Sequence, residues 1–138
     1  LLLVGTLADA VEDRLIHLFS KLGIETVRSL PPRQSSQLPP VGAGTTVLLT
    51  QPFLTETARL LRDRGATVLK APFPLGAEGS RRWMEAAADN FQCPEANVRN
   101  VLDPLEARAR IALAPHREVL AGKRVLTLKF SYLFFSNK

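Results

Sequence analysis

Residues 46–70 read TVLLTQPFLTETARLLRDRGATVLK, and this stretch decides the fold class. Short runs of leucine and β-branched residues stand at both ends, and the residues between them are apolar at helical spacing. Leu54, Ala58 and Leu61 fall on one face of the predicted helix at 55–64, and Gly65 follows it as a stop. A strand, a helix and a strand in this order predict parallel pairing, with the helix packed over the sheet.

The same pattern precedes this stretch, at residues 1–29. The residues predicted to face inward on its helix are Val11, Leu15, Leu18, Phe19 and Leu22. Thr6 with Asp9 three residues later suggests a capping box, and Gly23 ends the helix. The predicted strands span residues 1–5, 26–29, 46–50, 67–70 and 125–130. The fold class is therefore α/β, with a parallel sheet of about four strands flanked by helices and followed by a helical segment.

The chain divides into three predicted parts. Residues 1–75 form the parallel α/β domain and include a long Pro/Gly/Ser-rich connection at 31–45. Residues 76–122 form a helical segment that packs on this domain and links it to the next. Residues 123–138 form the first strand of that following domain, truncated or divergent.

Two sets of residues define faces in the helical segment. The first is Trp83, Ala86, Ala87, Asn90 and Phe91. The second has a regular 3.6-residue period and comprises Val98, Val101, Leu102, Leu105, Ala109, Ala112 and Leu113. Asp103 and Pro104 are predicted as N-cap and first residue of a long helix that follows a short one. Pro115 is predicted to break or kink the long helix near Ala114.

Composition excludes several classes of protein. Apolar residues make up 46% and charged residues 22%, as in soluble globular proteins, and no apolar run is long enough to span a bilayer. The net charge is +5, but the basic residues are scattered over the polar faces of predicted helices, so we expect no nucleic-acid stripe. Cys93 is the one cysteine, which favours a reducing compartment. A chain that opens without Met on a buried-type strand is expected to be a piece of a longer protein.

The residues assemble no active site that the sequence can identify. Gly42 and Gly44 precede a strand instead of following one, so they indicate a turn and not a dinucleotide fingerprint. His17 and His116 have no carboxylate or cysteine at ligand spacing, and Cys93 stands alone. We therefore predict no catalytic, cofactor-binding or metal-binding residue in this chain.

The loops at the carboxyl ends of the predicted parallel strands are the candidate sites, because open α/β sheets bind ligands there. They are residues 5–7, 51–53 and 71–76. Packing of their Phe and Pro side chains on the sheet edge is favoured over ligand contact, and Ser80 is predicted to cap the helix that follows. The candidate ligand- or interface-facing residues are Thr6, Leu7, Pro52, Phe53, Phe73, Pro74, Leu75 and Gly76.

Several of these segments together resemble one family over roughly residues 1–124. They are VGTLADAVEDRL at 4–15, KLGIETV at 21–27, QPFLTETAR at 51–59 and PFPLGAEGSRRW at 72–83. They are similar to the N subunits of dark-operative (light-independent) protochlorophyllide reductases, relatives of the nitrogenase molybdenum–iron protein. The resemblance implies a nitrogenase component 1-like, Rossmann-like fold.

The resemblance also implies an activity and its partners. The family's catalytic component is a heterotetramer of two N and two B subunits that reduces ring D of protochlorophyllide to give chlorophyllide a. Electrons arrive from a ferredoxin-fed iron–sulfur L protein dimer that hydrolyses Mg-ATP. A 4Fe–4S cluster is held by three cysteines of N and one aspartate of B, and those cysteines lie upstream of VGTLADAVEDRL. Cys93 matches none of them, so the fragment alone is expected to be inactive and to bind no cluster.

The resemblance implies a plastid stroma or the cytoplasm of a phototrophic bacterium. The chain departs from the family at Pro115 and in the tail VLTLKFSYLFFSNK at 125–138. Two other interpretations remain open. One is a stand-alone α/β domain that binds a nucleotide or another small ligand, and the other is a basic RNA-binding accessory domain.

Overall fold

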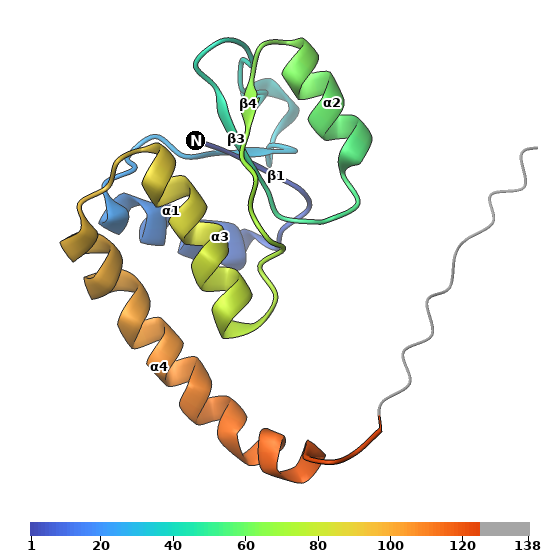
Figure 1. The fold of residues 1–138 in the computed structure, drawn as a ribbon. Helices are drawn as coiled ribbons and strands as arrows, with labels where there is room; N and C mark the ends of the chain where they lie inside the picture. The colour runs from blue at the N-terminus through green and yellow to red at the C-terminus, as the bar shows by residue number, and fades with distance from the viewer. Residues whose placement is uncertain (125–138) are drawn as a thin grey trace, which may run out of the picture.

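A parallel sheet with helices on both faces forms the body of the chain, as a computed structural model shows for residues 1–124 (Figure 1). The sheet has four strands in the order β2-β1-β3-β4, and every neighbouring pair is parallel. The strands are β1 (Leu2–Val4), β2 (Arg28–Leu30), β3 (Thr46–Leu49) and β4 (Thr67–Val68). The predicted α/β class and parallel pairing are confirmed.

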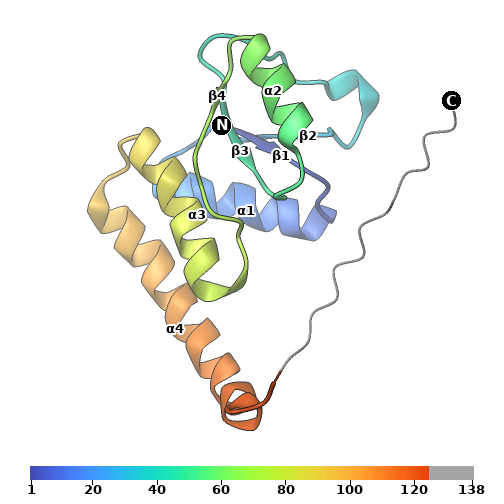
Figure 2. The ribbon, with the colours of Figure 1, turned by 45° about the vertical axis from the view of Figure 1, so that its right-hand side comes forward.

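Four α-helices and one short 3-10 helix connect and cover these strands (Figure 2). They are α1 (Asp9–Leu22), η1 (Ser35–Gln37), α2 (Thr55–Asp63), α3 (Gly76–Asn90) and α4 (Glu95–Leu120). The connection from β2 to β3 contains only η1, so the chain crosses β1 there without an α-helix.

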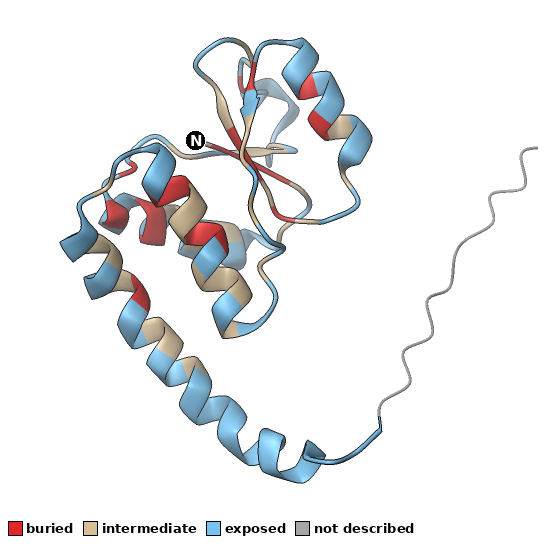
Figure 3. Cartoon of the chain, in the orientation of Figure 1, coloured by how far each residue is buried: buried red, intermediate tan, exposed pale blue. Residues whose placement is uncertain are grey.

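Alternation along the strands divides the core into two layers, because successive strand residues point to opposite faces. Leu3 and Leu48 face α1, α3 and α4, where Phe19 and Trp83 pack with their ring centroids 5.6 Å apart. On the other face, Leu2, Val4 and Val47 of the strands pack with Leu61 of α2 and with Ala66. Figure 3 shows these buried positions along the strands and inner helix faces, whereas the far half of α4 is exposed.

Strand boundaries differ from the prediction at β2 and β4. The ladder between β1 and β2 begins at Arg28, opposite Leu2, so β2 lies at Arg28–Leu30 and not at 26–29. β4 covers only Thr67–Val68, although the Leu69 N–H still donates to the Val47 carbonyl. These shifts follow from register, which a single strand's composition does not specify.

The predicted start of α1 is wrong and its predicted end is correct. Ala8 is the N-cap and no side chain caps the helix, so Thr6 does not form a capping box. Gly23 ends the helix in the left-handed conformation, with φ of 104°. Val11 is 47% exposed and does not face inward as predicted, although Leu18, Phe19 and Leu22 are buried.

The start of α3 also differs from the prediction. The helix begins at Gly76, so Ser80 lies inside it, where its hydroxyl donates to the Pro74 carbonyl instead of capping the N-terminus. Trp83 and Ala87 are buried as predicted, but Asn90 and Phe91 are exposed. Met84 and Ala88 complete the buried face in their place.

α4 is a single helix, and the predicted separation at Asp103–Pro104 is wrong. Buried Leu102 and half-buried Leu105 pack on both sides of Pro104. Arg81 of α3 binds Asp103 and Glu106, again on both sides of it. These contacts hold the helix together despite the missing N–H of the proline. Pro115 does not break the helix either, since α4 continues to Leu120.

The helical segment packs on the sheet, because Trp83, Met84 and Leu102 share one core with Leu3 and Leu48. Two other predictions about domain organisation, the division at residue 75 and the strand at 125–130, stay predictions. The division at residue 75 is not tested by this packing, and the predicted strand at 125–130 lies outside the described residues. Among residues 1–124 no helix combines the length and the apolar character needed to cross a membrane.

Candidate functional site

The carboxyl ends of β1 and β3 lie side by side, at the place where the strand order reverses. From β1 the chain moves to β2 on one side, and later to β3 and β4 on the other side. Such a switch point opens the crevice in which α/β sheets bind ligands. The predicted loops at 5–7 and 51–53 flank this point.

Hydrogen bonds join the two loops at this switch point. The Thr50 N–H and hydroxyl both donate to the Val4 carbonyl, at 2.9 and 3.1 Å. The Thr6 N–H donates to Gln51 Oε1 at 3.4 Å. Gly5 has φ of 138°, and a Cβ there would lie 2.1 Å from Thr50 Oγ1. The loops are therefore joined to each other at the carboxyl ends of β1 and β3.

Trp83 connects α3 to the same end of the sheet. Its indole Nε1–H donates to the Leu49 carbonyl at 2.6 Å, and the side chain is 1% exposed. The sequence predicted that Trp83 faces inward. The hydrogen bond was missed, because its acceptor is a backbone carbonyl more than thirty positions away in the chain.

The third predicted loop, 71–76, is a rigid corner between β4 and α3. Gly79 lets this corner approach the helix, because a Cβ there would meet the Phe73 carbonyl oxygen at 2.9 Å. The Leu75 N–H donates to the same oxygen at 2.7 Å, and the Ser80 hydroxyl donates to the Pro74 carbonyl. These contacts hold the corner against the start of α3, and the close approach of the Phe73 carbonyl explains the glycine at 79.

Three large apolar side chains at this edge of the sheet are exposed. Phe53 and Leu75 are both 74% exposed and Phe73 is 41% exposed. The favoured interpretation, that these aromatic side chains pack the sheet edge, is wrong for Phe53. Among the other candidates, Thr6, Pro52 and Gly76 are exposed, and Leu7 and Pro74 are half-buried. Their contact with a ligand or an interface stays a prediction.

Two arginines of the described residues, Arg81 and Arg33, each pair with three carboxylates. Arg81 binds Glu85, Asp103 and Glu106 at 2.7–2.9 Å, and hydrogen bonds from Arg110 and Arg81 lower the pKa of Glu106. Arg33 similarly pairs with Asp13, Glu12 and Asp9.

Two histidines and one serine are polar residues outside these ion pairs. His17 and His116 are exposed. Ser29 Oγ is buried without a hydrogen-bond partner, beside a hollow of about 550 Å³ between α1 and the loop at 32–38.

Cys93 has no second cysteine beside it among the described residues. Its thiol is half-buried, and burial followed by the nearby Asp89 charge raises its pKa. Within residues 1–124, no group of three His, Cys, Asp or Glu side chains is placed to hold a metal ion. The described part of the chain therefore offers no donor set for a cluster.

Comparison with known proteins gives one consistent result. The chain is 90% identical over 133 residues to light-independent protochlorophyllide reductase subunit N of Synechococcus sp. (strain WH7803). It is 78% identical to the subunit N of Parasynechococcus marenigrum (strain WH8102) and 65% identical to that of Prochlorococcus marinus (strain MIT 9313). Each match covers 96% of this chain, and the chain spans 31–32% of these relatives. No protein-family model matches the chain.

Proposed function

Since the chain is homologous over 96% of its length to a segment of light-independent protochlorophyllide reductase subunit N, we propose that it serves as that segment of the enzyme. The identity of 90% over 133 residues carries the proposal. Identity at this level leaves little room for a different core or different loops. The resemblance recognised from the sequence motifs is confirmed by these relatives.

The proposed reaction is the reduction of ring D of protochlorophyllide to chlorophyllide a, within a heterotetramer of N-type and B-type subunits. Electrons come from the ferredoxin-fed L protein at the cost of ATP. The relatives are cyanobacterial, which favours a bacterial cytoplasm over a plastid stroma.

Within that complex the proposed role of this chain is positioning and not cluster ligation. Its one cysteine is half-buried and has a raised pKa, so the cluster ligands are proposed to lie in the remainder of the longer subunit. The alternative, a stand-alone nucleotide-binding domain, has less support because the 90% identity is to a subunit N and not to such a domain.

A chimeric subunit tests the proposal. The segment of the WH7803 subunit N that aligns with residues 1–124 is replaced by this chain, and the product is purified with the B-type subunit. We expect chlorophyllide a to form in the dark when protochlorophyllide, L protein, reductant and Mg-ATP are supplied. The parental subunit is the positive control, and a subunit from which the aligned segment has been deleted is the negative control. A chimera that assembles with the B-type subunit as the parent does but forms no chlorophyllide a would refute the proposal.

A further inference from the structure

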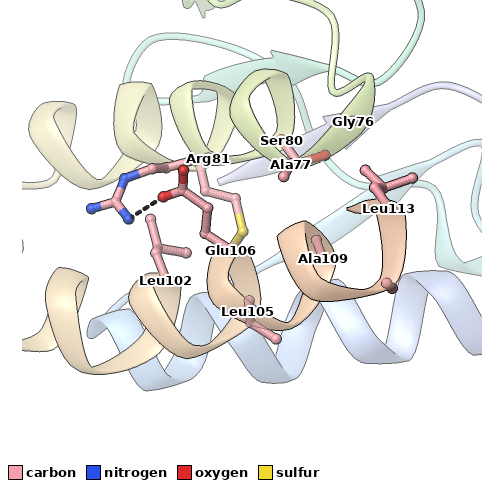
Figure 4. Close-up of a pocket in the computed structure, with 11 residues that line it drawn as sticks. Gly76, Ala77, Ser80, Arg81, Leu102, Leu105, Glu106, Ala109 and Leu113 are labelled. Atoms are coloured by element: carbon pink, nitrogen blue, oxygen red, sulfur yellow. Dashed lines mark hydrogen bonds and ion pairs between the residues drawn. The ribbon is translucent and has the colours of Figure 1, made fainter. Parts of the chain in front are cut away.

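An apolar groove of about 450 Å³ lies between α3 and the middle of α4 (Figure 4). Figure 4 shows Leu102, Leu105, Ala109 and Leu113 of α4 along one wall, with Ala77 and Ser80 of α3 opposite. Small residues on both helices leave room for another element to approach closely.

The groove continues the face of α4 that has the regular apolar period. The first half of that face is covered, since Leu102 is 3% exposed and Val98, Val101 and Leu105 pack against the core. The second half is not covered, because Ala112 and Leu113 are exposed. Within residues 1–124, one continuous apolar face therefore has a partner over only part of its length.

The far half of α4 also has no buried side chain within residues 1–124 to stabilise it. Every residue from 111 to 120 is exposed, and Pro115 removes the hydrogen bond to the Ile111 carbonyl. Helical segments of this length are marginal in water unless they pack against something. The side chains of Ile111 and Val119 are 75% and 71% exposed, although both are large and apolar.

The charges at the rim do not require a charged ligand. Arg81 is bound by Glu85, Asp103 and Glu106, and Arg110 pairs with Glu106 at 2.6 Å. An occupant therefore gains contact with apolar side chains and has few free charges to meet. These properties favour an apolar protein surface over a small anionic ligand.

We propose that the α3–α4 groove is filled by an apolar element from the part of the longer subunit N that this chain does not include. The chain spans 31% of the subunit N to which it is 90% identical, so most of such a subunit is available to cover the groove. This proposal rests on the proposed function, because it requires the chain to act within the longer polypeptide.

Two alanines of α4 provide a matched test. Ala112 lines the groove and Ala114 lies on the far side of the helix, yet both are exposed in this chain. Cysteine is introduced at the aligned position of each in the full-length WH7803 subunit N, and maleimide labelling is followed by peptide mass spectrometry. Rates are divided by those of the same variants in guanidinium chloride. We expect labelling at the Ala112→Cys position to be at least about tenfold slower than at the Ala114→Cys position. A tenfold difference corresponds to a free energy of about 1.4 kcal/mol for the local opening that exposes a buried site.

Each other outcome overturns the proposal. Equal labelling at the two positions means that the groove is open in the subunit. Protection that appears only after the B-type subunit is added means that this partner covers the groove. If the first variant does not fold, hydrogen exchange on the unmodified subunit decides, because rapid exchange at the amides aligned with 109–113 contradicts burial. An open groove in a subunit that is catalytically active would leave the proposed function intact.

Discussion

Trp83 is the residue on which both the core and the carboxyl edge of the sheet depend. Its ring packs against Phe19, and its indole N–H bonds the last carbonyl of β3. Replacing Trp83 with Phe retains most of the ring but leaves the Leu49 carbonyl without this donor. We predict a loss of about 1–3 kcal/mol in the free energy of unfolding, because the partly buried carbonyl loses its partner. Urea unfolding followed by circular dichroism measures this loss. Tryptophan fluorescence does not serve as the signal, because the chain has one Trp and the variant has none.

A Trp83→Ala variant separates the hydrogen bond from the packing. It removes the ring as well and is expected to cost about 3–5 kcal/mol. If Trp83→Phe were as stable as the unsubstituted chain, the bond to the Leu49 carbonyl would contribute nothing, and the proposed anchoring of α3 would be wrong.

At this scale the sequence predicted burial better than it predicted hydrogen bonds. The inward positions Leu18, Phe19 and Leu22 follow from periodicity alone. Capping by Thr6 and Ser80 was predicted from local spacing, but the chain entering each helix takes a different path. A side chain's partner depends on that path, which residue types do not determine.

Arg81 is the main polar connection between α3 and α4. It reaches Asp103 and Glu106 of α4, and Glu106 also receives hydrogen bonds from Arg110. These bonds lower the pKa of Glu106, with the Arg110 hydrogen bond as the largest cause. A carboxylate whose folded pKa is lowered stabilises the fold above its unfolded pKa of about 4.3, and this stabilisation is lost as the pH falls through the folded pKa.

We therefore predict a pH-dependent effect of the Glu106→Gln variant. At pH 7 it unfolds at lower urea concentration than the unsubstituted chain, and the difference shrinks as the pH falls below the unfolded pKa of about 4.3. Glu95→Gln is the control, since it removes an exposed carboxylate from the same helix without touching Arg81. A difference that stays constant from pH 7 to acid would show that Glu106 acts by packing and not by charge.

α4 shows why proline is an uncertain guide to where a helix ends. Pro104 and Pro115 both predicted an interruption, and the helix continues through both. At Pro104 the reason lies in tertiary contacts, because Leu102, Leu105 and the ion pairs of Arg81 hold both sides of the residue. Such contacts join residues distant in sequence, so local propensity does not reveal them.

For the whole molecule, the sequence predicted the architecture more completely than the site. Alternating strand and helix patterns determined the parallel sheet, because few other arrangements bury two such faces. The contacts at the switch point were not predictable, since they depend on how Gly5, Thr50 and Gln51 meet across neighbouring strands. The family motifs supplied what physical patterns alone did not, namely a reaction and a set of partners.

We propose that this chain forms part of the body of subunit N and contributes no cluster ligand. Iron content of the assembled complex tests it most directly. The chimeric subunit is prepared with the B-type subunit, with and without Cys93→Ser, and iron is measured per complex. We expect the same iron content with and without the substitution, because Cys93 is half-buried and its pKa is raised. Loss of iron from a Cys93→Ser complex that still assembles would contradict it.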